Sequence, residues 1–520
     1  MPSPALIVLF GVVVAGIVLQ YVQQRIRRRR HAQSLGCRPP AQGNRSFFGI
    51  QPFIEMAKAF REKQVVEHLA KQYGKYGNTH EQLVLGRAVI STIEPENIKA
   101  VLATKFNDFG LGSRHREFFP LLGDGIFTLD SGGWSHSRGL LRPQFTRDQV
   151  ADLNLMEGHV SQLIELIPKD GSSFDIQPLF FELTLDSSTH FLFGEGVGAL
   201  HRMGGVLGKT SVGNAEGFAE AFNAAQEYLA LRTRAGNFYW AFNSKSFQEH
   251  NKRVHEVVDY YVRLALQRRT HADNKHVSTR YIFADALAED TQDPKELRDQ
   301  MLNILLAGRD TTASLLSSTI FFLARDPGRW DKLRLAILEE FGDTWNPKGE
   351  ITQGRLKDVP YLRHVLSEVL RLMPPVSINF RVANKDTSLP VGGGADGKSP
   401  IFVTKGQPVV YSVWAMHRRT DLYGADASVF RPERWEEDGR HGWEYLPFNG
   451  GPRICLGQQY ALTEASYVIV RLMQRFDTLK CADPELKKPV IQSSLTISHD
   501  RGVKVNLVSS RSSDVGSTKY

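Results

Sequence analysis

Hydrophobic positions recur with a helical period over most of the chain and alternate with polar positions only in short stretches. The runs 294–326 and 358–373 place apolar residues three and four positions apart, which predicts long helices. The stretches "QLVLGRAVISTI" (82–93) and "SPIFVTKGQPVVYSV" (399–413) are rich in β-branched residues and predict short strands. The expected fold class is therefore mainly α with a small β region (α+β).

The N-terminus carries a different pattern, an unbroken apolar run over 5–19 followed by a cluster of arginines. A signal peptide would place its basic residues before the apolar run and a small-residue cleavage site after it. Here the order is reversed, which favours a membrane anchor over residues 1–24. Because positive charge stays on the cytoplasmic side, the rest of the chain is expected to face the cytosol.

The chain after the anchor shows no internal repeat and no break between domains. Residues 25–48 predict a basic linker that contains prolines, 49–507 a single domain, and 508–520 a polar, disordered tail. The stretch "VGGGADGKSP" (391–400) matches G-x-G-x-x-G, but a strand-like run follows it. A dinucleotide site needs a helix there, so we expect a glycine-rich hairpin loop.

The net charge of +8 arises largely from the N-terminus, where residues 25–30 contain five arginines and residues 1–31 no acid. The remaining chain carries only +3, without a basic stripe, so nucleic acid is not an expected partner. The 520 residues include three cysteines, far apart in sequence. That count predicts neither a disulfide framework nor a zinc site, and it indicates a reducing compartment.

One cysteine stands in an unusual setting, the segment "FNGGPRICLG" (448–457). Cys455 lies in a loop shaped by Pro452, Gly450, Gly451 and Gly457, just before a run with helical period. A helix N-terminus and a nearby cation both stabilise a thiolate, which can act as a nucleophile or as a metal ligand. No histidine base is placed to activate a nucleophile.

This segment resembles the haem-binding signature of the cytochrome P-450 superfamily, F-x-x-G-x-R-x-C-x-G, at all of its fixed positions. The resemblance implies the cytochrome P-450 fold and haem b as cofactor, with Cys455 as the thiolate ligand of the iron. It further implies that Arg453 meets a haem propionate and that Phe448 lies over the sulfur side of the haem.

Two further motifs occur in the order expected of this family. "EVLR" and "FRPERW" supply Glu368, Arg371 and Arg434, which the resemblance assigns to a buried structural network. Trp435 stands where the family often has phenylalanine.

The apolar run 294–326 contains "AGRDTT". A helix buried on most sides should not carry Asp310 and Thr311 without use. By resemblance, the Ala-Gly pair leaves room for dioxygen, and these two residues relay protons to it. Arg309 lies about 100° around the helix and need not face the haem.

Upstream, "GWSHSR" places Trp134 and Arg138 four residues apart, on one helical face. The resemblance assigns both to the haem propionates, with Arg381 in "INFRVA" as a further candidate. The motifs, with the anchor and the tail, extend the resemblance over nearly the whole chain.

The segments 109–145 and 379–401 resemble the fungal microsomal group that hydroxylates n-alkanes and fatty acids. This implies a monooxygenase of the endoplasmic reticulum membrane, crossing it once, which uses O2 and electrons from NADPH–cytochrome P-450 reductase. The first substrate-recognition region is apolar and suits a long aliphatic substrate or equally the core: Phe109, Leu111, Phe118, Phe119, Leu121, Leu122, Ile126 and Phe127. Alternatives that stay open are a tailoring oxidase of a non-linear secondary metabolite, a haem-thiolate isomerase or dehydratase, and a haem sensor.

Overall fold

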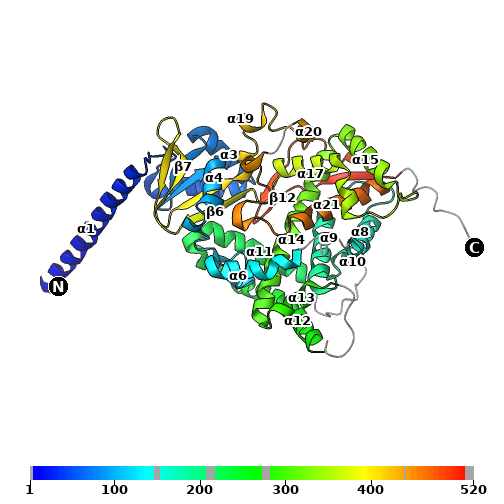
Figure 1. Cartoon of the computed structure of the whole chain (residues 1–520), viewed down its shortest axis with the longest axis horizontal. Helices are drawn as coiled ribbons and strands as arrows, with labels where there is room; N and C mark the ends of the chain where they lie inside the picture. Colours follow the sequence, from blue (N-terminus) through cyan, green and yellow to red (C-terminus); the bar gives the residue numbers. More distant parts are fainter. Residues whose placement is uncertain (1–3, 146–152, 206–216, 272–280, 438–440, 510–520) are drawn as a thin grey trace, which may run out of the picture.

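A computed structural model describes residues 4–145, 153–205, 217–271, 281–437 and 441–509. A helical body is joined to a smaller region of sheet, and one helix projects away from both (Figure 1). The helices of nine or more residues in the body are α2 (Ile50–Arg61), α3 (Val65–Tyr76), α5 (Arg114–Leu122), α6 (Ser131–Leu141), α8 (Asn154–Leu166), α9 (Ile176–Phe193), α11 (Phe218–Ala235), α12 (Lys245–His271), α14 (Pro294–Leu323), α15 (Pro327–Phe341), α17 (Pro360–Leu372) and α21 (Gln458–Arg475). The mainly helical prediction with minor sheet is confirmed.

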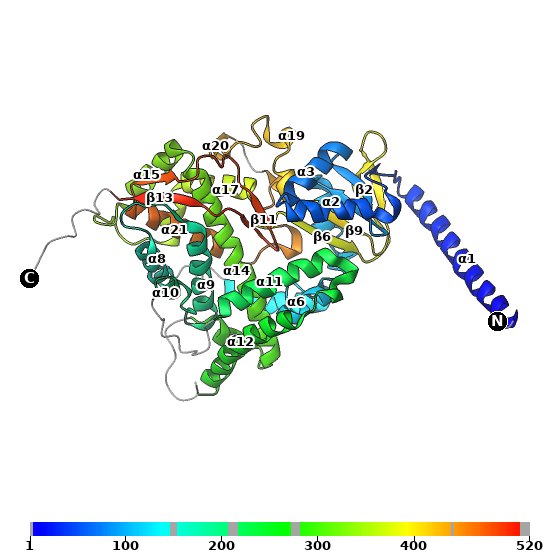
Figure 2. The ribbon, with the colours of Figure 1, turned by 180° about the vertical axis from the view of Figure 1, so that it is seen from behind.

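Helix α14 runs through the middle of the body and packs against α9, α12, α17 and α21 (Figures 1 and 2). Its start follows from the sequence, because the Asp293 side chain accepts a hydrogen bond from the Lys295 backbone N–H and Pro294 occupies the first turn. Most of its side chains are buried, as the apolar run predicted. The shorter helices are α4 (Pro95–Lys99), α10 (Ala199–Met203), α13 (Phe283–Asp290), α16 (Gln353–Lys357), α18 (Val413–Met416), α19 (Thr420–Tyr423) and α20 (Arg434–Glu437).

The larger sheet has the strand order β1-β2-β3-β9-β6-β4. Pairs β1/β2 and β3/β9 are parallel, whereas β2/β3, β9/β6 and β6/β4 are antiparallel. Its strands are β1 (Ala41–Gln42), β2 (Thr79–Val84), β3 (Arg87–Thr92), β4 (Phe109–Gly110), β6 (Ile378–Ala383) and β9 (Pro408–Ser412). The strands predicted in 82–93 and 399–413 are thus present, and β4 brings the segment after residue 108 beside β6.

The small strands complete the body. Strands β7 (Thr387–Gly393) and β8 (Ser399–Val403) form a hairpin around the glycine-rich loop, which confirms that no helix follows it. Strands β11 (Ile491–Ser493) and β12 (Ile497–His499) form a second hairpin, and β12 contacts α14. The third small sheet joins β10 (Thr478–Cys481), β13 (Lys504–Val508) and β5 (Phe174–Asp175).

The N-terminal helix α1 (Pro4–Ser34) continues well past the apolar run and includes the arginine cluster. Its segment Leu9–Ser34 is long and apolar enough to cross a membrane, and none of its most apolar window is buried. In the basic part of this segment, Arg28 Nε lies 3.2 Å from Asp386 Oδ2, in the connection between β6 and β7. Of the linker predicted over residues 25–48, residues 25–34 belong to α1, and the remainder contains β1 and a 3-10 turn, η1 (Phe47–Gly49). Residues 510–520 of the predicted tail lie outside the described residues.

Candidate functional site

The segment predicted to bind haem forms a tight loop that leads into α21. Gly451–Arg453 make one 3-10 turn, η7, and α21 begins at Gln458. The backbone N–H of Cys455 donates to Phe448 O at 3.1 Å, which closes the loop. The Cys455 side chain is exposed, while Phe448 is half-buried against the core. The loop therefore presents a thiol at the N-terminal end of a helix, as the sequence predicted.

Among the loop glycines, Gly451 is the one whose backbone requires glycine. Its φ of +68° is left-handed, and a Cβ there would lie 2.0 Å from Leu102 O. Gly450 and Gly457 have φ values of −154° and −84°, which other residues adopt readily. The expectation that all three glycines serve backbone conformation is wrong for these two. A Cβ at Gly450 would instead lie 2.7 Å from the Trp443 ring, so that position is restricted by packing.

The electrostatics of the thiol differ from the sequence prediction. Although its side chain is exposed, desolvation by the surrounding protein atoms raises the pKa of Cys455, and the Gly457 backbone N–H and the Arg138 charge oppose that rise without overcoming it. Arg453, the cation nearest in sequence, points elsewhere. Protein groups alone thus leave the thiol protonated, and a bound metal ion is the agent that would hold it as thiolate.

Four arginines gather on the side of the loop facing α6 and β6. Arg453 Nη2 donates to Asp130 Oδ1 at 2.7 Å, and its guanidinium lies 4.6 Å from the Trp134 ring centroid. Burial, together with the neighbouring charges of Arg381, Arg114 and Arg138, lowers the pKa of Arg453 to about 10 against the opposing charge of Asp130. Two carboxylates oppose these four cations, Asp130, which acts on Arg453 and Arg114, and Glu117, which acts on Arg114.

Arg114 was not predicted from the sequence. Arg114 Nη2 and Arg381 Nη1 donate to the same amide oxygen, Asn379 Oδ1, at 2.9 and 3.2 Å. Burial and the charge of Arg381 lower the pKa of Arg114 to about 10. No local motif marks it, because it joins the cluster only when β6 is placed beside α5.

These residues fit the acidic edge of a haem. A buried group of like charges is costly unless an anion compensates it, and two propionates supply that charge. Trp134 provides a second sign, since its buried indole N–H has no hydrogen-bond partner among the described residues. Arg138 lies 5.9 Å from the same ring and donates to Ile454 O at 3.0 Å, beside Cys455. The predicted residues Trp134, Arg138, Arg381 and Arg453 thus come together.

Helix α14 presents one incompletely covered stripe in an otherwise buried surface. Ile304, Ala307, Gly308 and Thr311 are half-buried, whereas most residues around them are fully buried. Their spacing of three and four places them on one face of the helix. The Thr311 hydroxyl donates to Ala307 O at 2.7 Å, which leaves its oxygen free to accept a hydrogen bond.

Asp310 lies next to this stripe and is 8% exposed. Burial raises its pKa, against the Arg309 charge and a hydrogen bond from Gln226 of α11. Arg309 Nη1 lies 3.3 Å from Asp310 Oδ1, and the same nitrogen donates to Asn223 Oδ1. The Arg309 guanidinium lies 5.5 Å from the Phe181 ring centroid, so this side chain is directed toward α9.

Glu464, a buried glutamate of α21 near this stripe, was not predicted from the sequence. Glu464 of α21 is 1% exposed, accepts a hydrogen bond from Ser187 Oγ of α9 and bonds the side chain of Thr312. Burial raises its pKa to about 7. Glu464 lies seven residues, about 10 Å, along α21 from the Cys455 loop, so it ties that helix to α14.

The predicted Glu-Arg-Arg network is present and fully buried. Arg371 Nε and Nη2 donate to the two Glu368 oxygens at 2.9 and 2.8 Å, and Arg434 Nε lies 3.6 Å from Glu368 Oε1. The Trp435 indole N–H adds a donor at 3.1 Å from Glu368 Oε2. Tryptophan therefore replaces phenylalanine with a gain in hydrogen bonding, which the sequence did not reveal.

The apolar segment around α5 divides between core and accessible positions. Ile126 and Phe127 are half-buried against the core, and Phe119 is exposed, with its ring near Lys295 at 5.4 Å. The other five predicted pocket residues are buried in the core: Phe109, Leu111, Phe118, Leu121 and Leu122.

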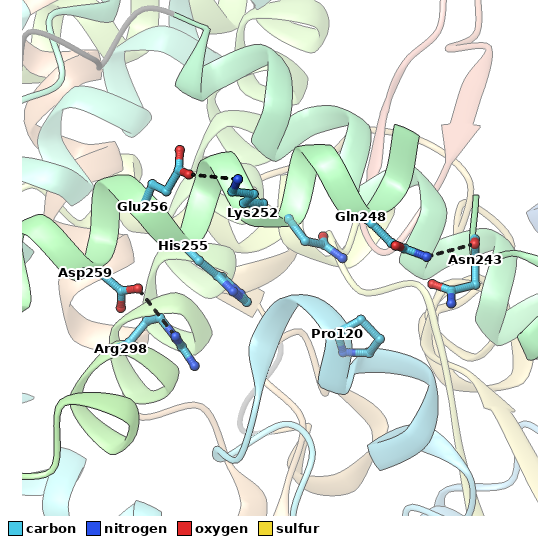
Figure 3. Close-up of a pocket in the computed structure, with 9 residues that line it drawn as sticks. Pro120, Asn243, Gln248, Lys252, His255, Glu256, Asp259 and Arg298 are labelled. Carbon is cyan, nitrogen blue, oxygen red and sulfur yellow. Dashed lines mark hydrogen bonds and ion pairs between the residues drawn. The ribbon is translucent and has the colours of Figure 1, made fainter. Parts of the chain in front are cut away.

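A separate polar pocket of about 440 Å³ opens at the surface between α5, α12 and α14 (Figure 3). Its charged groups pair with one another, Lys252 with Glu256 at 3.8 Å and Arg298 with Asp259 at 3.5 Å. None of the predicted site residues lines it, so it is distinct from the candidate site.

Comparison with known proteins agrees with this geometry. The family model described as Cytochrome P-450 matches residues 39–506. Cytochrome P-450 52A12 of Debaryomyces hansenii is 49% identical over 96% of this chain and 97% of its own length. Cytochrome P-450 52A3-A of Candida maltosa is 46% identical over 96% of both chains. Cytochrome P-450 monooxygenase g430 of Fusarium sp is 48% identical over 95% of this chain and 89% of its own length.

Proposed function

Because this chain belongs to the cytochrome P-450 family and is a haem-dependent monooxygenase, we propose that it hydroxylates long aliphatic substrates at a haem held by Cys455. The observation that carries the assignment of Cys455 is an accessible thiol in a closed loop beside four arginines. The bound haem supplies oxygen activation and insertion of one oxygen atom into a C–H bond.

The protein's part begins with holding the cofactor. Cys455 would ligate the iron, and Phe448 would pack against the haem. Arg453, Arg381 and Arg138, with the Trp134 indole N–H, would bind the propionates. Arg114 joins this set through its shared contact with Asn379. Neutralising the buried cations with two carboxylates orients the cofactor and removes their mutual repulsion.

Helix α14 provides the two residues that would move protons, Asp310 and Thr311. Because the Thr311 hydroxyl donates its hydrogen bond to Ala307 O, its oxygen can accept a hydrogen bond from a water molecule on the open stripe. Asp310, whose pKa is raised by burial, exchanges protons more readily near neutral pH than an ordinary aspartate does. The two residues therefore act in sequence, with the acid as proton source and the threonine as the group that positions the water.

Reducing power originates with NADPH and arrives through a redox partner, and NADPH–cytochrome P-450 reductase is the partner proposed. A long aliphatic chain, an alkane, a fatty acid or the alkyl part of a metabolite, is the proposed substrate, with oxidation at or near the chain end. The half-buried Ile126 and Phe127 and the apolar stripe of α14 support this choice, since affinity for such chains comes from buried apolar area.

The proposed location is the endoplasmic reticulum membrane, crossed once by α1 with the body in the cytosol. The five arginines after the apolar run support that orientation. Exposed aromatic groups on the body would add a peripheral contact, Phe47 at 90% exposed and Trp240 at 65%.

The test is the absorption of the reduced carbon monoxide complex in the wild type and in Cys455→Ser. The wild type should show the band typical of thiolate ligation, and the variant should lose it. Persistence of that band in Cys455→Ser would exclude Cys455 as the ligand. Hydroxylated product formed in proportion to NADPH, with purified reductase, separates a monooxygenase from an isomerase or a haem sensor.

A further inference from the structure

Two arginines, Arg232 and Arg234, lie near the C-terminal end of α11, and their guanidinium groups are hydrogen-bonded to different extents. Arg232 is 3% exposed and gives every nitrogen to a backbone carbonyl, including Glu117 O at 2.7 Å and Arg116 O at 2.9 Å of α5. This fully satisfied arginine is structural, since it fastens α11 to α5. Arg234, two residues later, is bound far less completely.

Arg234, near the C-terminal end of α11, contacts Phe60 of α2 and Ser493 of the β11–β12 hairpin. Figure 2 shows α2, α11 and β11 in the same part of the body. Arg234 Nη2 donates to Ser493 O at 2.5 Å and lies 3.4 Å from Ser494 O, at the hairpin turn. Its guanidinium stacks 4.1 Å from the Phe60 ring centroid. These contacts fix the direction of the group while leaving the Nε and Nη1 donors without a partner among the described residues.

The charge of Arg234 is uncompensated. No carboxylate within the described parts of the chain forms an ion pair with it, although its side chain is half-buried. Burial alone lowers its pKa to about 10, and no acidic group opposes that shift. A desolvated guanidinium with spare donors in a fixed orientation is suited to a carboxylate, which it can bind through two hydrogen bonds.

The position of Arg234 relative to the candidate site indicates which end of an extended substrate would carry this carboxylate. Gln226, which hydrogen-bonds Asp310, lies eight residues earlier on the same helix, about 12 Å along its axis. The hairpin that holds Arg234 also reaches α14, where His499 Nε2 lies 3.1 Å from Ser318 Oγ. A molecule extending from the open stripe of α14 along α11 would therefore place its far end at Arg234.

The segments that flank Arg234 carry exposed apolar side chains. Phe238 is 54% exposed immediately after α11, and on α2 Phe53 and Ile54 are 40% and 57% exposed. These groups would favour an amphipathic ligand taken from an apolar phase, with the aliphatic part leading and the polar end remaining near the rim.

We propose that Arg234 binds the carboxylate of a long-chain fatty acid whose distal end reaches the oxidising site. The assignment rests on the proposed function and selects the fatty acid among its aliphatic substrates. It is consistent with the proposed oxidation near the chain end, because a carboxylate fixed at the rim leaves only the distal carbons within reach of the site.

The experiment compares three ligands of equal chain length, hexadecanoate, methyl hexadecanoate and hexadecane, bound to the full-length holoenzyme and followed by haem absorption. Arg234→Gln should raise the Kd for hexadecanoate about 10- to 100-fold, the range for a charged hydrogen-bonded pair. The Kd values for the ester and the alkane should change less than about threefold. Arg234→Lys keeps the positive charge but loses the two-pronged guanidinium. Its Kd for hexadecanoate should therefore lie between those of the wild type and Arg234→Gln.

The matched control is Arg61→Gln, which removes an exposed arginine from α2 next to Phe60 and should leave all three Kd values unchanged. In the wild type itself, hexadecanoate should bind more tightly than its ester. Equal losses for all three ligands in Arg234→Gln, or no loss for hexadecanoate, would overturn the assignment. Failure of the wild type to oxidise any of them would instead overturn the proposed function, and the assignment with it.

Discussion

Replacing Glu464 with glutamine should make the protein more stable above neutral pH. The native carboxyl has a pKa of about 7 against 4.5 for an ordinary glutamate, because burial disfavours its charged form. The native state thus binds the proton more tightly than the unfolded state. The contribution of Glu464 to stability is greatest below about pH 4.5 and decreases as the pH rises from 4.5 to 7. At about 1.4 kcal/mol per pKa unit, ionised Glu464 costs about 3 kcal/mol at pH 8.

Glutamine keeps the shape and an acceptor for Ser187 but cannot ionise. Guanidinium unfolding of the full-length holoenzyme, followed by far-UV circular dichroism, should give Glu464→Gln an advantage approaching 3 kcal/mol at pH 8. That advantage should shrink below about 1 kcal/mol at pH 5. A variant less stable than the wild type by the same amount at both pH values would refute the reasoning.

Glu157 provides the opposite control. Burial raises its pKa, but hydrogen bonds from Tyr467 and Arg471 outweigh this and lower it overall. Its stabilising contribution is present above the unfolded pKa and disappears as the pH falls through the lower native value. Glu157→Gln should therefore destabilise the protein at pH 8, and the difference should diminish on acidification.

Other sites give further expectations. Thr311→Ala should keep its haem but lower the ratio of hydroxylated product to NADPH consumed, by at most about 10²–10⁴-fold; Thr311→Ser should restore it, and an unchanged ratio in the alanine variant would leave the residue a packing role. Removing residues 1–24 should release protein from membranes with haem retained; loss of haem would make that segment part of the fold. Trp435→Phe should cost about 1–3 kcal/mol in guanidinium unfolding, since it removes a donor to buried Glu368. Trp414→Phe, whose indole N–H has no partner among the described residues, should cost less, and equal costs would deny the hydrogen bond a role.

Local patterns were sufficient for much of this site. The order of proline, glycines and a helical run located the Cys455 loop, and the four-residue spacing of Trp134 and Arg138 put both on one face of α6. Glu368 and Arg371 likewise form their predicted pair. Each of these relations depends on neighbours within a few residues, so the sequence determines them directly.

Relations between distant segments were the ones that escaped prediction. Arg114 and Asn379 are 265 positions apart, and only the pairing of β4 with β6 brings their chain segments together. The thiol pKa depends on burial by the whole fold, which outweighs the local helix and cation effects. Sequence adjacency was misleading for Arg453, whose partner is Asp130 rather than Cys455.

Because α1 is one continuous helix, the N-terminal segment is a stiff strut and not a flexible linker. Its 31 residues span about 46 Å, whereas the apolar core of a bilayer is about 30 Å thick. About 15 Å of stiff, basic helix then stands above the proposed membrane, and Arg28 clamps it to Asp386. Such a strut limits the orientations of the body to those permitted by its own tilt. The exposed aromatic groups would thus contact the lipid surface at a preferred height and angle. A flexible linker would instead leave the orientation of the body relative to the membrane undefined.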